Sequence, residues 1–177
     1  MSDTASIDIE ALRAKIRDIP DFPQPGILFR DITPLLADPA AFRRVIDVMA
    51  APYVGIETVV AIESRGFILG APLAYALDAG LVPVRKLGRL PAATLREEYA
   101  LEYGSNTVEV HQDAIAPGGR VVIVDDLLAT GGTVRAAANL VERLGAVIAG
   151  ITVLAELTAL RGRDLLADYE VRSLVEY

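Results

Sequence analysis

The chain has 177 residues, 53% of them hydrophobic, and its 17 basic and 24 acidic residues give a net charge of -7. This length suffices for one domain with a buried core, and the acidic balance argues against general nucleic-acid binding, which depends on Lys and Arg contacts to phosphates. With no cysteine and a single histidine, the composition excludes disulfides, thiolate metal sites and a cysteine nucleophile, and leaves little room for Ser-His-Asp chemistry.

The longest uncharged apolar stretches, residues 67–77 and 145–155, are much shorter than the roughly 20 residues of a membrane-spanning helix. The first residues, MSDTASIDIEALRAK, lack the basic start, apolar block and small-residue cleavage site of a secretion signal. We therefore expect a cytoplasmic protein without a membrane or nucleic-acid partner.

The N-terminal part of the chain is predicted to hold one helix and a proline-rich segment. Ile9, Leu12, Ile16 and Ile19 recur at three- and four-residue spacing, which predicts a helix over residues 7–19 that ends at Pro20. Residues 20–39 are rich in proline, which predicts a rigid, extended surface segment without long regular structure. Such a segment can act as a lid.

From Asp38 and Pro39, which offer a helix start, the chain alternates between the two kinds of element. Helices are predicted over residues 65–77 and 132–144, and strands over residues 58–62, 81–86, 107–111, 120–126 and 146–154. This alternation predicts an α/β fold whose mostly parallel central sheet is covered by helices on both faces. Residues 87–106 lack clear periodicity, so we expect a functional loop there.

A glycine-rich turn follows the clearest predicted strand, which ends in Asp125 and Asp126. The turn ATGGT consists of Ala129, Thr130, Gly131, Gly132 and Thr133. Glycines let the backbone approach an anion, and a helix N-terminus at the carboxyl end of a parallel strand favours phosphate. The segment lacks a Walker A lysine and dinucleotide-binding glycine spacing. The whole string therefore predicts a phosphate cradle beside two acids, although the acid pair or the glycine pair alone would fit a plain strand end and turn.

The string VVIVDDLLATGGT at residues 121–133 resembles the signature of the type I phosphoribosyltransferases, which bind 5-phosphoribosyl 1-pyrophosphate. The resemblance implies a fold of that type, in which residues 129–133 wrap the 5-phosphate. Asp125 and Asp126 would accept hydrogen bonds from the ribose hydroxyls. It also implies a Mg²⁺ cofactor that is carried mainly by the substrate near these two acids, without a direct protein ligand.

Three further blocks, residues 22–39, 63–74 and 85–104, resemble the members of this family that act on adenine. The resemblance implies one phosphoribosyltransferase domain over residues 1–177, with an N-terminal helix and purine-binding hood in residues 1–38 and a core in residues 39–177. In the hood, backbone groups around Leu28 and Arg30 would read the base, with Phe29 nearby. The residues alone would also fit a proline-rich surface loop with an aromatic anchor.

Four basic residues are candidates for the pyrophosphate end of the substrate. Arg65, in the turn ESRG, lies where a predicted strand gives way to a helix N-terminus. Arg85, Lys86 and Arg89 form a basic cluster that could neutralise a departing pyrophosphate. Ordinary solvated charges remain the alternative for all four.

Glu102 and Tyr103, in the string LEYG, match family positions at the far end of a flexible catalytic loop, about residues 87–106, that closes over the site and excludes water. The match implies that Glu102 manages the purine's imidazole proton or offsets charge on the ribose, and that Tyr103 positions the ribose. From the residues alone, a solvated glutamate and a packing tyrosine fit equally. His111, outside every matched block, is expected to be structural.

Together these features predict transfer of the phosphoribosyl group from 5-phosphoribosyl 1-pyrophosphate to adenine, giving AMP and pyrophosphate in purine salvage. The resemblance also implies a homodimer. One alternative is a phosphoribosyltransferase for xanthine, hypoxanthine or orotate, against which the hood and LEYG argue. Another is a non-catalytic regulator that senses 5-phosphoribosyl 1-pyrophosphate and binds nucleic acid, against which the acidic charge argues.

Overall fold

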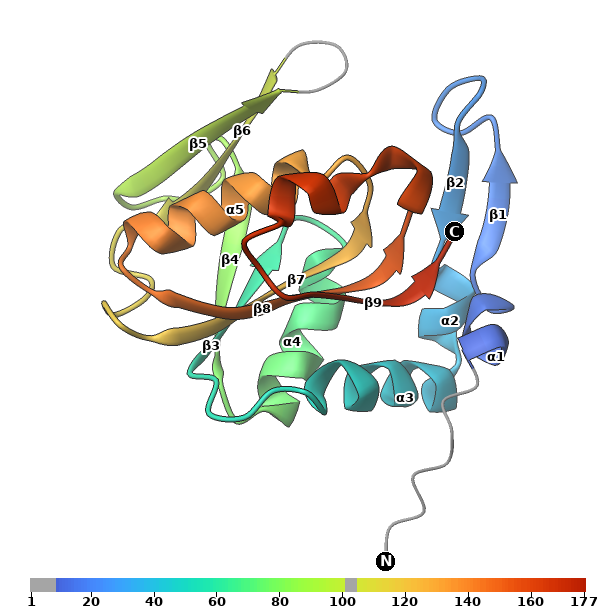
Figure 1. Cartoon of the computed structure of the whole chain (residues 1–177), viewed down its shortest axis with the longest axis horizontal. Helices are drawn as coiled ribbons and strands as arrows, with labels where there is room; N and C mark the ends of the chain where they lie inside the picture. The colour runs from blue at the N-terminus through green and yellow to red at the C-terminus, as the bar shows by residue number, and fades with distance from the viewer. Residues whose placement is uncertain (1–8, 101–104) are drawn as a thin grey trace, which may run out of the picture. The chain divides into compact units, whose positions relative to one another are not determined.

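The computed structural model describes residues 9–100 and 105–177. The chain divides into two compact units, Met1–Val45 and Ile46–Tyr177. The first contains α1 (Ile9–Arg13), the strands β1 (Arg17–Pro20) and β2 (Leu28–Asp31), α2 (Thr33–Ala37) and the start of α3 (Pro39–Ala50). The second is built around one large sheet (Figure 1).

The predicted helix over residues 7–19 is wrong in its second half, because α1 ends at Arg13 and residues 17–20 form β1. β1 pairs antiparallel with β2, from Arg17↔Asp31 to Pro20↔Leu28. The connecting turn is closed by Asp21, whose Oδ1 accepts the N–H of Gly26 at 2.8 Å. Pairing with a strand further along the chain is invisible to local periodicity and here overrides it.

The helix start at Asp38 and Pro39 is confirmed. Asp38 Oδ1 accepts the N–H groups of Ala40 and Ala41, both at 3.0 Å, which satisfies two of the donors that a helix N-terminus leaves unpaired. The Lys15 ammonium lies 2.6 Å from Asp38 Oδ2 and, with these backbone bonds, holds the pKa of Asp38 below its ordinary value.

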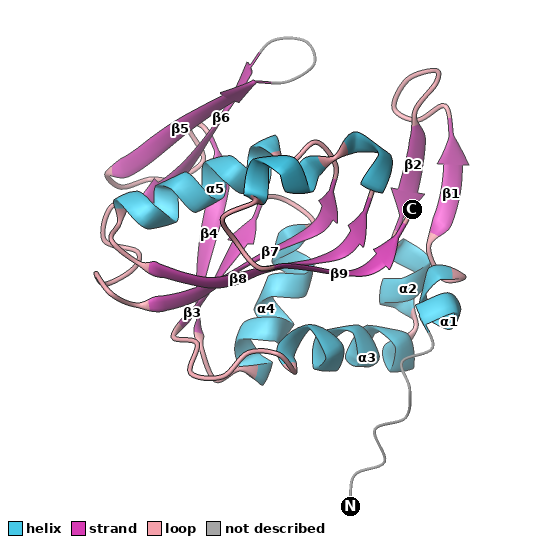
Figure 2. Ribbon diagram, viewed as in Figure 1, coloured by secondary structure: helices cyan, strands magenta, loops and turns pink. Residues whose placement is uncertain are grey.

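Seven strands form the sheet of the second unit, in the order β5-β6-β4-β3-β7-β8-β9. They are β3 (Thr58–Ile62), β4 (Gly80–Lys86), β5 (Thr94–Ala100), β6 (Ser105–His111), β7 (Arg120–Leu128), β8 (Val147–Glu156) and β9 (Val171–Glu176). The run from β4 to β9 is parallel, and β5 and β6 are antiparallel additions at one edge (Figure 2). The expected mostly parallel α/β fold is confirmed.

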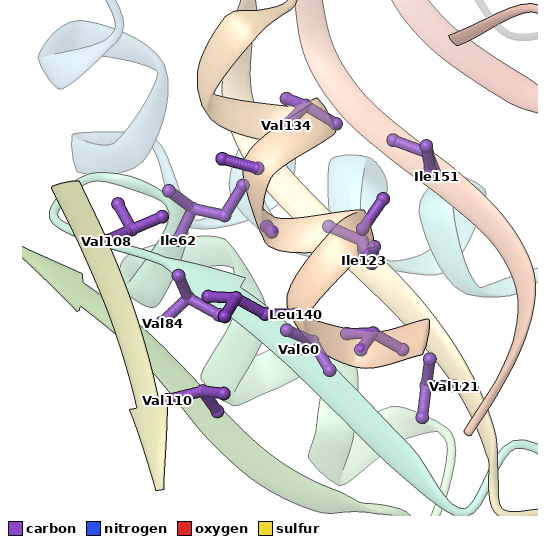
Figure 3. Close-up of a cluster of buried hydrophobic side chains, with 14 of the residues drawn as sticks. Val60, Ile62, Val84, Val108, Val110, Val121, Ile123, Val134, Leu140 and Ile151 are labelled. Atoms are coloured by element: carbon purple, nitrogen blue, oxygen red, sulfur yellow. The ribbon is translucent and has the colours of Figure 1, made fainter. Parts of the chain in front are cut away.

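Helices cover both faces of this sheet, as expected. α5 (Gly132–Arg143) packs Val134 and Leu140 onto the face that carries Val60 and Ile62, which forms the main core (Figure 3). α4 (Gly66–Ala76) covers the other face, toward which Ala61 points. A Cβ at Gly70 of α4 would lie only 2.5 Å from the Ala61 Cβ, so this glycine permits the close approach of helix and sheet.

The expectation of irregular structure through residues 87–106 is wrong for residues 94–100, which form β5, and for residues 105 and 106, which begin β6. Charged residues obscured this strand, because β5 is the edge of the sheet and contacts α5 through polar groups. Glu97 accepts hydrogen bonds from Asn139 at 2.8 Å and Arg143 at 3.0 Å. β9 and the two 3₁₀ turns before it, η1 (Thr158–Leu160) and η2 (Gly162–Leu166), were also not predicted.

Over the described ranges, 9–100 and 105–177, no helix has the length and apolar character needed to cross a membrane.

Candidate active site

The topology of the sheet creates a crevice between β3 and β7. From β3 the chain passes through α4 to β4 on one side, whereas from β7 it passes through α5 to β8 on the other side. Ligands of open parallel sheets bind where the strand order reverses in this way, beyond the carboxyl ends of the strands. The predicted phosphate loop and the turn with Arg65 follow these two strands.

The loop after β7 forms a cradle at the start of α5. β7 continues to Leu128, so Asp125 and Asp126 lie within the strand, and the prediction that it ends at Asp126 is wrong. Gly131 adopts φ +85°, a left-handed conformation that favours glycine, directly before α5 begins at Gly132. Asp125 and residues 127–134 line a cavity of about 70 Å³. The start of α5 is part of this lining, and a helix N-terminus offers unpaired N–H groups.

Gly162 of η2 packs against the back of this loop. A Cβ at Gly162 would lie 2.3 Å from the Ala129 carbonyl oxygen, and a Cβ at Gly131 would lie 2.4 Å from the Gly162 carbonyl oxygen. The two backbones therefore touch without room for a side chain. Gly162 was not among the predicted site residues, since nothing local to the string LRGR marks a contact with the distant loop.

A second cavity, of about 330 Å³, adjoins the first, and its size falls within the roughly 300–1,000 Å³ of small-molecule sites. Both cavities share Asp125, Leu127 and Thr133 as wall residues. The second is lined by the ends of β3, β4 and β7, by β5 and β6, and by the first turn of α5: Glu63, Ser64, Arg65, Lys86, Tyr99, Asn106, Asp125, Asp126, Leu127 and Thr133. The structure thus brings Arg65 and Lys86 together with the acid pair.

Tyr99 and Asn106, which face each other across β5 and β6, were not among the predicted site residues. Their only sequence signal is their position inside or beside the block at residues 85–104. Recognising β5 as a strand would have placed Tyr99 opposite Asn106.

The acid pair places two carboxylates side by side in a site where Asp126 is buried and Asp125 is half-buried. Asp126 is 6% exposed, and Arg65 Nη2 lies 2.9 Å from its Oδ2. Burial and then the charge of Asp126 raise the pKa of Asp125 well above its ordinary value. Burial also raises the pKa of Asp126, against the opposing effect of Arg65. The site therefore favours a ligand that donates hydrogen bonds or brings positive charge to these carboxylates.

The turn that carries Arg65 packs closely on the acid pair. A Cβ at Gly66, the first residue of α4, would lie 3.0 Å from Asp125 Oδ1. Gly66 therefore allows the start of α4 to lie against the end of β7, which brings Arg65 within reach of Asp126.

The predicted basic cluster is only partly directed at the cavity. Lys86 lines it, but Arg85 donates to Glu63, with Nε 3.1 Å from Oε2 and Nη2 3.3 Å from Oε1. Burial raises the pKa of Glu63, but the bonds from Arg85 and the Lys86 N–H outweigh it and leave that pKa below its ordinary value. Arg89 is exposed, and its carbonyl oxygen accepts Arg85 Nη1 at 3.1 Å.

The predicted hood residues lie on β2, in the first unit. Leu28 is 44% exposed, the Phe29 ring packs edge-on against Phe22 with centroids 5.1 Å apart, and Arg30 pairs with Asp18. Glu102 and Tyr103 lie outside the described residues, so their predicted roles rest on the sequence. Outside the site, His111 Nε2 accepts the N–H of Ala92 at 3.4 Å.

The metal expectation concerns the acid pair. In the part of the chain that the structure describes, no group of three or more His, Cys, Asp or Glu side chains is placed to hold a metal ion. Asp125 and Asp126 nevertheless offer two carboxylates, the hard oxygen ligands that Mg²⁺ uses when substrate phosphates complete its coordination. The donor set fits magnesium that arrives with a phosphorylated substrate.

Comparisons with known proteins agree with this site. Residues 35–176 match the family model of the phosphoribosyl transferase domain. The adenine phosphoribosyltransferase of Thermobifida fusca is 56% identical over 172 residues, which cover 96% of this chain and 98% of the relative.

Solved structures give the same assignment. The adenine phosphoribosyltransferase of Thermoanaerobacter pseudethanolicus superposes with a TM-score of 0.92 at 52% identity, covering 96% of this chain and 99% of that one. The enzyme of Saccharomyces cerevisiae, solved with an imino-altritol bisphosphate and adenine, has a TM-score of 0.89 at 41% identity and covers 94% and 97%. The chain therefore belongs to the adenine phosphoribosyltransferase family.

Proposed function

We propose that this chain transfers the phosphoribosyl group of 5-phosphoribosyl 1-pyrophosphate to adenine, giving AMP and pyrophosphate in purine salvage. The observation that carries the proposal is the order of groups along the crevice. A phosphate cradle at residues 129–133 comes first, the acid pair next, and the cavity with Arg65 and Lys86 last. This order matches the 5-phosphate, the ribose and the pyrophosphate of one substrate.

The phosphate end is bound mainly by backbone. Thr130 and Thr133 add hydroxyl donors to the N–H groups at the start of α5, and the helix dipole favours negative charge there. Because the cradle contains no basic side chain between Ala129 and Val134, affinity depends on the shape of the loop rather than on a point charge.

The ribose hydroxyls donate hydrogen bonds to Asp125 and Asp126. These bonds favour the ionised carboxylates, which burial disfavours. When Mg²⁺ is bound there with the diphosphate, it supplies positive charge that neutralises the leaving group. Arg65, already 2.9 Å from Asp126, can donate to both the acid and the pyrophosphate.

The pyrophosphate leaves toward the basic side of the larger cavity. Lys86 and Arg65 line this side, while Arg85 donates to the Arg89 carbonyl oxygen in the turn that follows β4. Guanidinium and ammonium groups that are held in place stabilise charge as it develops in the transition state. Tyr103 is assigned to the ribose and Glu102 to the proton of the purine, both by family resemblance.

Adenine is assigned to the hood around Leu28, Phe29 and Arg30. β2 belongs to a two-stranded sheet, so one edge of it carries backbone N–H and C=O groups that face away from β1. A neighbouring C=O and N–H can accept from the exocyclic amine of adenine and donate to the ring nitrogen beside it, whereas a 6-oxo purine presents the opposite pattern.

A homodimer in the cytoplasm completes the proposal. Tyr75 and Ile68 on α4 are 91% and 44% exposed, and Leu81 on β4 is 43% exposed. Large apolar side chains left on the surface near the ends of an active-site helix suit a subunit interface. Light scattering behind size-exclusion chromatography should give twice the chain mass, and a Tyr75→Arg variant should shift it toward the monomer.

The decisive experiment incubates the protein with 5-phosphoribosyl 1-pyrophosphate, Mg²⁺ and each purine base in turn and measures nucleotide formation. We expect AMP from adenine, and loss of the reaction after chelation of the metal. Product from hypoxanthine but none from adenine would contradict the base assignment. No product from any base, together with a gel shift of duplex DNA at low salt, would favour the regulatory alternative.

A further inference from the structure

Glu109, on β6, is a buried carboxylate that does not line either cavity. It is 1% exposed. Its Oε1 accepts the N–H groups of Arg89 at 3.0 Å and Leu90 at 3.1 Å. Its Oε2 accepts the Thr94 hydroxyl at 3.2 Å and lies 3.5 Å from Nε of Arg96, whose side chain is exposed. Burial of a carboxylate is costly unless hydrogen bonds compensate for the lost water. Here burial raises the pKa of Glu109, but the backbone bonds outweigh it and keep that pKa below its ordinary value.

These bonds fix one side of the turn that follows β4. Arg85 fixes the other side, because its Nη1 donates to the Arg89 carbonyl oxygen at 3.1 Å. Arg85 and Glu109 are direct partners in the pairing of β4 with β6. The peptide groups of Arg89 are thus held by an acid at the N–H and by a cation at the C=O.

The same network continues to the wall of the larger cavity. Arg85 also binds Glu63, and Glu63 Oε2 accepts the backbone N–H of Lys86 at 3.0 Å. Glu63 and Lys86 both line the cavity. A continuous path of hydrogen bonds therefore runs from Glu109, through Arg89 and Arg85, to the basic side of the site.

We propose that Glu109 is a positioning residue that holds the basic turn of residues 85–90 in place and thereby sets the affinity for the pyrophosphate end of the substrate. The proposal rests on the assignment of pyrophosphate to the cavity beside Arg65 and Lys86. Its physical basis is preorganisation: a turn already fixed by buried hydrogen bonds loses little conformational entropy when the anion binds.

The pattern of hydrogen bonds allows the role of the Glu109 oxygen as an acceptor to be tested separately from the role of its negative charge. Both backbone N–H groups donate to Oε1, so a glutamine can retain both bonds through its single carbonyl oxygen and can donate its amide N–H to Thr94. It loses only the ion pair with Arg96, which is weak because the Arg96 side chain is exposed. A negative charge here would oppose pyrophosphate binding, not assist it. Glu109→Gln should therefore preserve pyrophosphate binding. Glu109→Met, of similar length but with only a weakly accepting thioether sulfur, should weaken it.

The test measures binding of pyrophosphate with Mg²⁺, and separately of AMP, by isothermal titration calorimetry. For Glu109→Met we expect the dissociation constant of pyrophosphate to rise by about tenfold or more, while that of AMP changes by less than about threefold. Glu109→Gln should stay within about threefold of the unmodified protein for both ligands. The proposal would be overturned if Glu109→Met weakened the binding of pyrophosphate and of AMP equally. It would also be overturned if Glu109→Met and Glu109→Gln had equal effects on pyrophosphate binding.

Glu156→Met is the matched control for the loss of a buried carboxylate. Glu156 is 3% exposed and pairs with Arg163, but it lies on β8, three strands from β4 in the sheet. We expect it to leave pyrophosphate binding intact. If Glu109→Met does not fold, Glu109→Asp replaces it: its shorter side chain draws the oxygen away from the turn, and unchanged pyrophosphate binding in this variant would overturn the proposal.

Lys86→Ala distinguishes this inference from the assignment on which it rests. If Lys86→Ala weakens pyrophosphate binding and Glu109→Met does not, Glu109 has no positioning role and the pyrophosphate assignment stands. If Lys86→Ala has no effect either, the assignment fails, and the role of Glu109 fails with it.

Discussion

Replacing Gly162 by alanine tests whether η2 sets the shape of the phosphate loop from behind. The added Cβ would lie 2.3 Å from the Ala129 carbonyl oxygen and 3.0 Å from the Gly131 nitrogen, where ordinary contact begins at 3.4 Å. Relief of this overlap requires the two backbones to separate by roughly 1 Å.

The loop, not η2, is expected to move. Arg163, the neighbour of Gly162, is bound to Glu156 through contacts of 2.7–3.0 Å and to the Val171 carbonyl oxygen at 2.8 Å. These bonds tie η2 to both β8 and β9. The displacement therefore falls on residues 129–131, whose backbone is proposed to bind the 5-phosphate.

A shift of about 1 Å in groups that hold a substrate can cost on the order of 10²-fold. For Gly162→Ala we expect KM for 5-phosphoribosyl 1-pyrophosphate and the dissociation constant of AMP to rise by about that factor, equivalent to roughly 2.7 kcal/mol. The dissociation constant of pyrophosphate, which lacks the 5-phosphate, should change by less than about threefold. Initial rates and titration calorimetry measure these quantities.

Gly80→Ala is the matched control, because a Cβ at Gly80 would lie 3.5 Å from the nearest atom, the Glu57 carbonyl oxygen, in ordinary contact. It should bind AMP normally. The reasoning is refuted if folded Gly162→Ala, judged by circular dichroism, binds AMP as tightly as the Gly80 variant does. A parallel loss of pyrophosphate affinity would indicate a general disturbance of the site instead.

Three further predictions concern chemistry, pH dependence and packing. Glu102→Gln should lower kcat by about 10²-fold with little change in KM for 5-phosphoribosyl 1-pyrophosphate; an unchanged kcat in steady-state assays removes Glu102 from the mechanism. Asp125→Asn should raise the Tm of the ligand-free protein at pH 7 by about 2–4 °C, because burial and the charge of Asp126 raise the pKa of Asp125. A raised pKa stabilises the fold below the ordinary carboxyl pKa and loses that stability as pH rises, so the advantage of the variant should grow from acid to neutral pH in thermal scans, and a constant difference would contradict this. Gly70→Ala should destabilise the fold by about 1–3 kcal/mol, since its Cβ would lie 2.5 Å from that of Ala61; an unchanged urea midpoint would show that α4 can move away from the sheet freely.

The centre of the fold could be predicted because burial leaves a local pattern. The runs at residues 58–62 and 120–126 are apolar throughout since helices cover both faces of the sheet, and β3 and β7 form there. The strands at the edge of a sheet have no such continuous apolar run. β5 is charged because it faces solvent and a polar side of α5, and β1 forms only through its pairing with β2.

The candidate site divides in the same way. Groups that touch the proposed substrate lie in short strings after strand ends, so the acid pair and the loop at residues 129–133 could be found from sequence. The residues that fix the position of these loops come from distant parts of the chain. Gly162 contacts the loop from η2, and Glu109 contacts the turn after β4 from β6; neither contact has a counterpart in local spacing.

The charges of Asp125 and Asp126 explain why the site needs these contacts from distant parts of the chain. Two adjacent carboxylates with raised pKa values, Asp126 buried and Asp125 half-buried, destabilise the site. Among the described ion pairs, one close cation, Arg65, is paired with Asp126. If the walls of the site could move, the two carboxylates could separate and gain more contact with water. Gly66 and Gly70 allow α4 to pack closely on β7 and β3, and Gly162 allows η2 to pack closely on the phosphate loop. Rigid packing thus preserves an unfavourable arrangement of charge, and a ligand with hydroxyl donors and a bound cation gains affinity by relieving it.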